Sequence, residues 1–424
     1  MKLLYDFLVR TKNVERASFL WNMVAYTSNS FQSMLLLMVI TRQGDLEGAA
    51  IFSIAYTAAS MLSYVGKYSV RNYQVSDVKR EYTYGEYAYT RKMTVFAMLM
   101  ATAAYLIYCW IFKDYSAYKT ACVLLMVGYR LIESLEDVFH GDLQLNQRLD
   151  IASKIWGIRT LAYIVSFMAL YRIAGSILIA AVGSLLITIM LFFGLNHMVS
   201  GIFPRNEECQ KRNVLQLLKA CFPIALSTFL MVYISNSPKY AVDAVLTSEE
   251  QACFNIVFMP VFVITLLGSY MYNPFVSKMA SFWKEGRAEE LKRLIIRQIM
   301  IILFLSLIVI IGGRLFGIRI LELLYKVSLE HYEWEFTCLM IAGGALAIFN
   351  LLLVIATVIR RQKMLLYISV VSALAFVVGN KRILLLAGVR RMCEYYAVVM
   401  AIMTLITLML CMRSVKGSGK ERCE

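Results

Sequence analysis

Charged residues are scarce in this sequence, and so are the side chains that build metal or redox sites. Asp, Glu, Lys and Arg make up 17% of the 424 residues, and there are only three histidines. The histidines lie far apart, and the nine cysteines form no Cys-x-x-Cys pair, so we expect no metal site and no bound cofactor. The Gly-rich loop that cradles nucleotide phosphates is also missing, so we expect no ATP hydrolysis.

Apolar residues dominate instead, at 60% of the chain, and they gather in long runs separated by short loops. A run of about 20 apolar residues matches the thickness of a bilayer when it coils as a helix. Only helices and closed barrels satisfy their backbone hydrogen bonds in lipid, and these runs are too long for barrel strands. The sequence therefore predicts an all-α polytopic membrane protein.

The apolar runs predict twelve transmembrane helices in sequence order. Residues 1–16 are polar and amphipathic, so we expect no cleavable signal peptide before the first helix. The eleventh run is the shortest, because Lys381 and Arg382 interrupt it. The predicted spans are 17–40, 46–66, 93–112, 118–139, 155–172, 174–199, 214–236, 249–273, 295–317, 333–358, 364–380 and 392–412.

The distribution of Lys and Arg predicts the orientation. Most of the 43 basic residues fall in the tails and in the loops that lie on the same side, above all in 67–92 and 277–297. Basic loops are retained in the cytoplasm, so both termini should be cytoplasmic. The net charge of +15 is spread over many loops without a basic, aromatic-interleaved module, which argues against nucleic acid and favours contact with anionic membrane lipid.

A short sequence pattern recurs in the two halves of the chain. Glu47, Ala50, Phe52 and Ile54 recur, with the same spacing, as Glu249, Ala252, Phe254 and Ile256, each time where a span begins. We interpret this as a duplication into two parallel six-helix lobes, at 1–200 and 214–424, joined by a cytoplasmic linker at 201–213. Such repeats suit a transporter with its binding site between the halves.

The fourth predicted span contains charges that are costly in lipid. Arg130 lies near its middle and is followed by Glu133, Glu136 and Asp137; helical spacing places Arg130, Glu133 and Asp137 on one face. A charge at mid-bilayer costs about 3 kcal/mol on insertion scales, so such residues face protein or water. Two interpretations stay open: a self-neutralising ladder of ion pairs, or a hydrated cavity in which Arg130 meets an anionic substrate.

Further charges give a wider set of candidates. Arg159 could extend its guanidinium to the inner membrane surface or face the cavity, and Lys239 could mark the end of a span or supply a second cation. For a coupling ion, either Na⁺ or H⁺, the candidate carboxylates are Glu133, Asp137, Asp243 and Glu394. All five prolines lie in the second half; Pro223 and Pro260 fall inside spans, as static kinks or as bending points of a gate.

Three segments resemble polysaccharide-type flippases of the multidrug/oligosaccharidyl-lipid/polysaccharide exporter (MOP) superfamily. Residues 48–56 resemble the entry of the family's second helix, and 66–77 resemble a loop motif of one bacterial subgroup. Residues 236–240, Asn-Ser-Pro-Lys-Tyr, stand where many members carry an Asn-x-Asp-Arg-Tyr-like segment. Pro238 replaces the acid there and Lys239 the arginine, which keeps a cation but no Asp-Arg pair.

The resemblance implies a protein of the bacterial cytoplasmic membrane that flips polyprenyl-pyrophosphate-linked oligosaccharide for O-antigen, capsule or exopolysaccharide synthesis. It implies two lobes forming a V, open alternately to each side around a cationic cavity, and it makes polysaccharide polymerase or assembly proteins possible partners. Lys67 and Arg71 would help to capture pyrophosphate at the inner mouth, although a positive-inside signal alone would also explain them.

Two other functions compete with this interpretation. A drug/cation antiporter of the same superfamily should offer acids to its cavity, whereas the charges named above are mainly basic. A polyprenyl-dependent glycosyltransferase or polymerase should carry catalytic acids or a large outer domain, and the predicted outer loops are short. We therefore expect a transporter and no enzyme.

Overall fold

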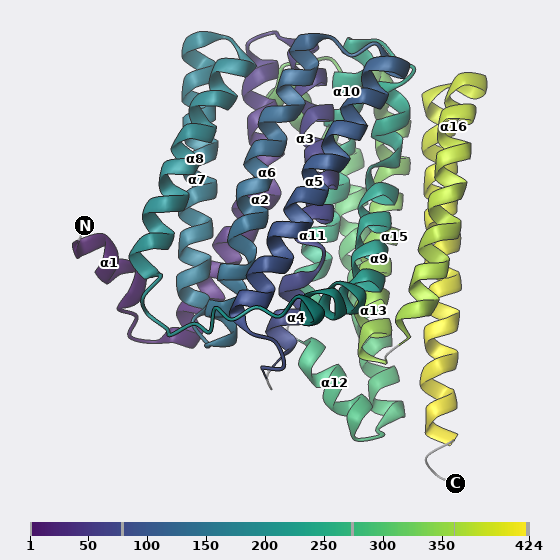
Figure 1. Ribbon diagram of the computed structural model, residues 1–424. Helices are drawn as coiled ribbons and strands as arrows, with labels where there is room; N and C mark the ends of the chain where they lie inside the picture. The colour runs from purple at the N-terminus through teal and green to yellow at the C-terminus, as the bar shows by residue number, and fades with distance from the viewer. Residues whose placement is uncertain (1, 78–79, 273–274, 360, 421–424) are drawn as a thin grey trace. The chain divides into compact units, whose positions relative to one another are not determined.

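The computed structural model describes residues 2–77, 80–272, 275–359 and 361–420, and every regular element in these ranges is a helix. The chain forms two compact units, Met1–Phe229 and Leu230–Glu424 (Figure 1). In the described ranges, ten helices are long and apolar enough to cross a membrane by length and composition. The predicted all-α polytopic class is confirmed.

The first unit is built around one central helix, α6, which packs against α3, α5, α7 and α8. Four of its helices begin where the sequence supplies an N-terminal cap; Asn13, Asp45, Thr83 and Ser116 each accept a hydrogen bond from a backbone N–H in the first turn. The elements are α1 (Lys2–Val9), α2 (Val14–Arg42), α3 (Leu46–Lys67), α4 (Val70–Ser76), α5 (Tyr84–Lys113), α6 (Ala117–Leu145), α7 (Leu149–Ala174), α8 (Ile177–Val199) and the first part of α9 (Lys211–Asp243).

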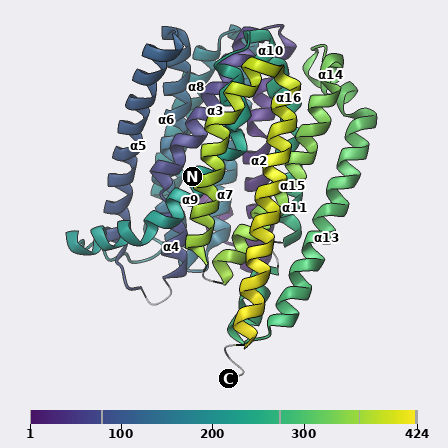
Figure 2. The same cartoon turned by 90° about the vertical axis from the view of Figure 1, so that its right-hand side faces the viewer.

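The second unit is also organised around one helix, α15, which packs against α10, α11, α13 and α16 (Figure 2). Besides the end of α9, its elements are α10 (Ser248–Phe258), α11 (Pro260–Tyr272), α12 (Val276–Lys284), α13 (Ala288–Gly312), the π-helical turn Gly313–Gly317, α14 (Ile318–Tyr325), the 3₁₀ turn Glu330–Tyr332, α15 (Glu333–Val358) and α16 (Gln362–Lys420).

The last element, α16, reverses direction at Gly388 and so contains two of the predicted spans. Gly388 has φ 81° and ψ 179°, a conformation that L side chains rarely adopt. Its two halves lie side by side in Figure 2, and the Tyr395 hydroxyl donates to the Ala375 carbonyl over 2.8 Å. Lys381 and Arg382 are exposed on a continuous helix, so the eleventh span was predicted to end too early.

Two further boundaries differ from prediction for local reasons. The predicted span 249–273 is divided at Met259, because Pro260 lacks a backbone N–H and begins α11, whereas α9 passes through Pro223 without a break. The charged α6 is not among the ten apolar helices, although it lies over the predicted fourth span. A gating role for Pro223 or Pro260 stays a prediction.

The division into units falls within α9. Leu217 and Cys221 of its first turns pack with Val70, Tyr87 and Val138 of the first unit. The stretch 201–229, which includes the predicted linker 201–213, therefore belongs to the first compact unit. The proposed duplication into 1–200 and 214–424 stays a prediction.

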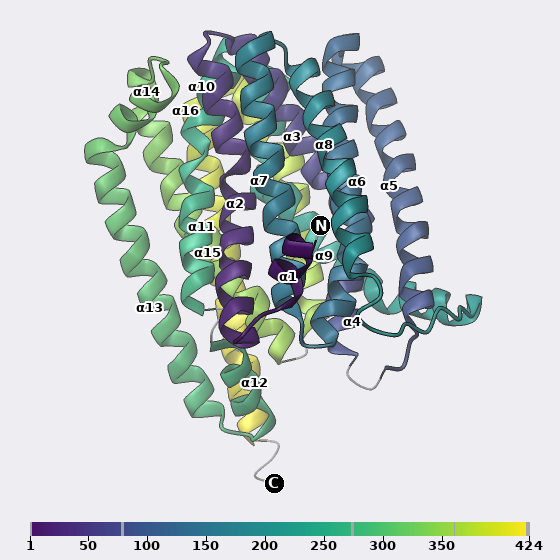
Figure 3. The same ribbon diagram turned by 90° about the vertical axis from the view of Figure 1, so that its left-hand side faces the viewer.

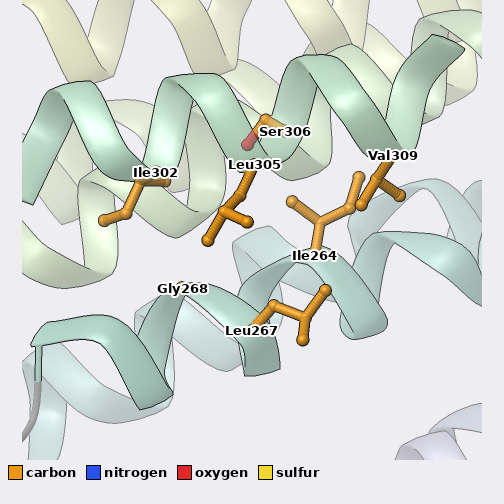
Figure 4. A pocket seen from close by; sticks show the side chains of 7 residues that line it. All are labelled: Ile264, Leu267, Gly268, Ile302, Leu305, Ser306 and Val309. Carbon is orange, nitrogen blue, oxygen red and sulfur yellow. The ribbon is translucent and has the colours of Figure 1, made fainter.

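One small gap lies between α11 and α13 in the second unit (Figure 4). It is too small to hold a water molecule, and Ser306 is the only polar side chain in its lining. Gly268 lines it where the chain comes close to α15; a Cβ there would lie 3.1 Å from that of Ala347. Its lining offers nothing that would hold a charged or sugar-bearing group. The lining residues are Ile264, Leu267, Gly268, Ile302, Leu305, Ser306 and Val309.

Candidate functional site: a charged cluster around α6

Charged side chains from five helices, the short α4 among them, meet around the second half of α6 in the first unit. We call them the charge cluster. It comprises three carboxylates of α6 and five cations that lie on α3, α4, α5, α6 and α7. Its members are Glu133, Glu136 and Asp137 with Lys67, Arg71, Arg91, Arg130 and Arg159.

Arg130 is held by a full set of partners. Its Nη1 lies 2.6 Å from Glu133 Oε2, one turn along α6, and its Nη2 donates to the Tyr56 hydroxyl over 2.5 Å. Ser60 Oγ at 3.2 Å and Asn29 Oδ1 at 3.4 Å complete the contacts. The guanidinium also lies over the Tyr56 ring, 4.8 Å from its centroid. Arg130 therefore faces protein and is paired, as a charge at this depth requires.

Glu133 and Glu136 connect α6 to α3, α7 and α8. Besides Arg130, Glu133 faces Lys67 Nζ at 3.6 Å and Arg159 Nη2 at 3.7 Å. Glu136 Oε2 lies 2.8 Å from Arg159 Nε, and its Oε1 accepts from Asn196 Nδ2 over 2.9 Å. Arg159 is thus enclosed between two carboxylates, which answers the sequence alternative: its guanidinium does not extend to the membrane surface.

Asp137 joins two arginines that come from different elements. Its Oδ2 lies 2.8 Å from Arg91 Nη2, and its Oδ1 lies 3.5 Å from Arg71 Nη1. Arg91 also donates to the Gly66 carbonyl at the end of α3, and Arg71 donates to Gln144 Oε1 over 2.8 Å. The carboxylate therefore links α4 and α5 to α6.

The buried part of the cluster is balanced in charge, and the surplus is positive and accessible. The side chains of Arg91, Arg130 and Arg159 are 2%, 8% and 1% exposed, and they face the three carboxylates. Lys67 and Arg71 are 33% and 24% exposed and add two further positive charges. A balanced interior keeps the desolvation cost compensated, while the two exposed cations remain available to an anion.

Several buried polar atoms near these residues have no hydrogen-bond partner. They include Arg159 Nη1 and Glu133 Oε1, the latter 3.7 Å from Arg159 Nη2. Their presence beside the charge cluster makes this region the polar interior of the first unit.

The structure thus brings together six of the predicted charged site residues within the first unit. Arg130, Arg159, Lys67, Arg71, Glu133 and Asp137 all belong to the charge cluster. Lys239, Asp243 and Glu394 belong to the second unit.

Lys239 is buried in an aromatic setting. Its ammonium lies over the rings of Phe258 and Phe262, at 5.2 and 5.1 Å from their centroids. No carboxylate in the described ranges lies within ion-pair distance of it. Two residues before Lys239, Ser237 accepts a hydrogen bond from Asn380 Nδ2 of α16 over 3.0 Å. Lys239 is therefore a buried basic candidate in the second unit that has no acidic partner among the described residues.

The two carboxylate candidates of the second unit are engaged locally. Asp243 Oδ1 accepts from Gln251 Nε2 over 3.1 Å near the end of α9. Glu394 lies 2.7 Å from Arg391 and accepts from the Trp334 indole N–H over 2.9 Å. Among the described residues, no group of three or more His, Cys, Asp or Glu side chains is placed to hold a metal ion.

Sequence reasoning missed Arg91, which it assigned to a basic loop. The signal was a capping box: Thr83 accepts from the Glu86 N–H and Glu86 accepts from the Thr83 N–H. This box starts α5 at Tyr84, well before residue 93, and so places Arg91 two turns inside a helix. Tyr56, Ser60 and Asn29 carried no comparable signal, because their contacts depend on how separate helices pack.

No protein-family model and no curated protein sequence matches the chain. Solved structures do. An inward-facing multidrug resistance MATE family transporter of the MOP superfamily matches with TM-score 0.65 and 15% identity, over 94% of this chain and 99% of that one. The outward-facing form of such a transporter matches with TM-score 0.61 and 14% identity, over 98% of both chains. The chain has the fold of these transporters.

A third match is a MOP superfamily transporter from Pyrococcus furiosus, described as having a binding pocket of reverse polarity that suggests a different function. It has TM-score 0.57 and 13% identity and covers 96% of each chain. Identities this low establish the fold alone. The substrate must be argued from the residues of this chain.

Proposed function

We propose that this protein flips polyprenyl-pyrophosphate-linked oligosaccharide across the bacterial cytoplasmic membrane by alternating access. The charge cluster is the observation that carries the proposal. Its three buried arginines are balanced by carboxylates, and its surplus charge, Lys67 and Arg71, is partly exposed. A MOP-type fold and the flippase-like segment 66–77, which contains both cations, support it.

The chemistry of a pyrophosphate suits these two cations. An anion of this charge cannot cross hydrocarbon unaided, because it loses its hydration without compensation. Arg71 offers a planar fork for two phosphate oxygens, and Lys67 offers a compact charge with rotatable donors. Asp137 contacts Nη1 of Arg71 and Gln144 contacts its Nη2, so the orientation of the guanidinium is fixed before an anion arrives.

Arg130 takes a different place in this proposal from Lys67 and Arg71. Its close pairing with Glu133 supports the ion-pair interpretation in the conformation described, so first capture of phosphate falls to the exposed cations. Arg130 would contribute to recognition when the site rearranges during transport, with Lys239 as the candidate cation of the second unit. Glu133 and Asp137 each face at least two cations, so a coupling Na⁺ or H⁺ would have to compete with them.

The second candidate function is export of drugs or other organic cations. It is favoured by the fold, since several similar structures are described as multidrug resistance MATE transporters. The two most exposed members of the charge cluster, Lys67 and Arg71, are both cations, and this favours an anionic substrate over a cationic one.

A flipping assay in proteoliposomes separates the two functions. The probe is a fluorescent polyprenyl-pyrophosphate oligosaccharide whose label is destroyed by an impermeant reductant once it reaches the outer leaflet. Replacing both Lys67 and Arg71 by Gln should lower the flipping rate at least about tenfold, the loss of two charge-assisted contacts. The matched control replaces Arg80 and Lys92, which are exposed in the same stretch, by Gln. Unchanged flipping by the double variant, or transport of a cationic dye in place of the lipid, would refute the proposal.

A further inference from the structure

The short N-terminal helix α1 projects sideways from the first unit, across the direction of the long helices (Figures 1 and 3). One of its apolar side chains, Leu8, is fully buried in a core cluster with Leu143 and Ile151. Val9 packs against the same cluster, whereas Leu3 is 88% exposed and Phe7 45% exposed, and Leu4 and Tyr5 are also exposed. The helix is therefore attached through its carboxyl end, where the Phe7 ring also lies 5.6 Å from that of Trp21, and its amino end presents a second apolar face to its surroundings.

Charged residues at the start of α7 hold the carboxyl end of α1 in place. Lys154 Nζ donates to the carbonyls of Phe7 and Leu8 over 2.8 and 3.2 Å, and Arg148 Nη2 donates to the Val9 carbonyl over 2.6 Å. These are the carbonyls that a helix end leaves without partners, at the negative end of its dipole. Asp150, fully buried, lies 2.9 Å from Arg148. We call Arg148, Asp150 and Lys154 the α1 anchor.

Thr11 extends the anchor to the segment between α1 and α2. Its hydroxyl donates to Asp150 Oδ2 over 2.7 Å and lies 2.9 Å from Lys154 Nζ. Buried hydrogen bonds to charged groups are among the stronger ones in proteins. The orientation of α1 is thus fixed by the protein, and its outward apolar face cannot turn back onto the core.

The surroundings of this face identify what covers it. Four basic side chains near it are exposed: Lys2, Arg10, Lys12 and Arg16. The acids in this stretch are only Asp6, which pairs with Arg10, and Glu15. The apolar face also continues into the first turns of the spanning helix α2, where Phe19, Leu20 and Met23 are exposed. A surplus of basic side chains beside an apolar face is the pattern of a helix that lies in the surface of an acidic bilayer.

We propose that α1 lies in the plane of the membrane surface and binds acidic lipid, with the α1 anchor transmitting its position to α7. Leu3, Leu4 and Phe7 enter the acyl-chain boundary, while Lys2, Lys12 and Arg16 contact acidic headgroups. The partner is the bilayer itself, and this role is independent of the transported substrate.

The depth of α1 is measured with an environment-sensitive fluorophore on the Leu3→Cys variant, with Cys209 and Cys423 replaced by Ser. The protein is placed in nanodiscs of zwitterionic lipid with or without phosphatidylglycerol. We expect blue-shifted emission, quenching by spin-labelled lipid, and iodide quenching about threefold weaker than for the same fluorophore on the native, exposed Cys209. Solvent-like emission at residue 3 in both lipids would overturn the proposal, and so would a disulfide between the introduced thiols of two unlabelled Leu3→Cys copies.

Charge and anchoring are tested separately with the same fluorophore. The triple variant Lys2→Gln, Lys12→Gln, Arg16→Gln should lose the response to phosphatidylglycerol, whereas Arg390→Gln with Arg391→Gln, an exposed basic pair of the second unit, should keep it. Lys154→Gln should increase iodide access to residue 3, and Lys154→Arg should restore part of the protection. If the triple variant responds to acidic lipid like the parent, the headgroup contact is wrong; if Lys154→Gln leaves access unchanged, the anchor is wrong.

Discussion

Arg91 links three helices of the first unit through a single guanidinium. It belongs to α5, donates to the Gly66 carbonyl at the end of α3 and pairs with Asp137 of α6. Thr94 donates to the same carbonyl over 2.7 Å. The end of α3 is thus capped by α5, just before the segment that carries Lys67 and Arg71.

Arg91→Gln should lower the free energy of unfolding by about 3 kcal/mol, because it leaves a largely buried carboxylate with only one, more distant cation. The control is Lys92→Gln, one residue away and exposed, which should change stability by less than about 0.5 kcal/mol. Thermal unfolding of the purified protein in detergent measures both. Equal stability of the two variants would show that the Arg91 contacts contribute nothing to the fold.

Arg130 allows its two interpretations to be separated by experiment. An Arg130→Gln protein that still inserts should lose flipping of the lipid-linked glycan, and Arg130→Lys should keep part of it, since charge survives without the bidentate fork. A purely structural role predicts instead a stability loss that Arg130→Gln combined with Glu133→Gln relieves. Lys67 and Arg159 also face Glu133, so this relief would be partial. Full flipping by the well-expressed single Gln variant would remove Arg130 from the mechanism.

At the level of helices, the sequence predicted the spans well and the helix ends poorly. Apolar run length is a property of the chain itself, and bilayer thickness makes it decisive. Helix ends depend on caps, which lie in polar residues outside the apolar runs, as Thr83 and Glu86 show for α5. The partners of Arg130 could not be predicted, because Tyr56, Ser60 and Asn29 meet it only through the packing of α2 and α3 on α6.

Glu86 caps α5 and also contacts the linker 201–213 and the first turn of α9, so its substitution tests whether the linker is held in place. Its Oε1 accepts from Asn213 Nδ2 over 2.7 Å and from the Gln210 N–H over 3.3 Å, while its Oε2 completes the capping box of α5. Glu86→Gln should weaken both contacts and speed proteolysis within 201–213. Glu250→Gln provides the control, because Thr247 and Glu250 form a similar capping box in the second unit. If both variants are cut at the parent's rate, the carboxylate does not hold the linker.

For the whole molecule, the first prediction concerns orientation. Both termini and the loops 67–92 and 277–297 should be cytoplasmic, because basic loops resist translocation. Single cysteines at Arg80 and Ser281 should resist an impermeant maleimide applied to intact cells, whereas a cysteine at Gln43, exposed between α2 and α3, should react. The reverse pattern of labelling would invert the orientation and with it the direction of capture at Lys67 and Arg71.

One pairing of helices recurs in both units, and the duplication itself stays a prediction. In the first unit, α3 packs on the central helix α6 and α2 packs on α7. In the second, α11 packs on the central helix α15, and Ser237 of α9 meets Asn380 in the first half of α16. Each unit thus pairs its second span with its fourth. In the second unit, α9 meets both halves of α16, because the Tyr396 hydroxyl also donates to the Ser235 carbonyl over 3.4 Å.

If the halves arose by duplication, Phe52 and Phe254 occupy equivalent places, and an experimental structure should superpose 1–200 on 210–424 with these rings aligned. Both side chains are almost fully buried, at 1% and 0% exposure, so each unit should lose about 3–5 kcal/mol when its phenylalanine is replaced by alanine. Thermal unfolding of Phe52→Ala and Phe254→Ala compares them directly, with Phe19→Ala, exposed on α2, as the control that should cost far less. A large difference between the two buried sites, or rings at non-equivalent positions, would show that the matching residues arose without a common repeat, and that the recurring pairing of helices reflects the constraints of bundling six helices.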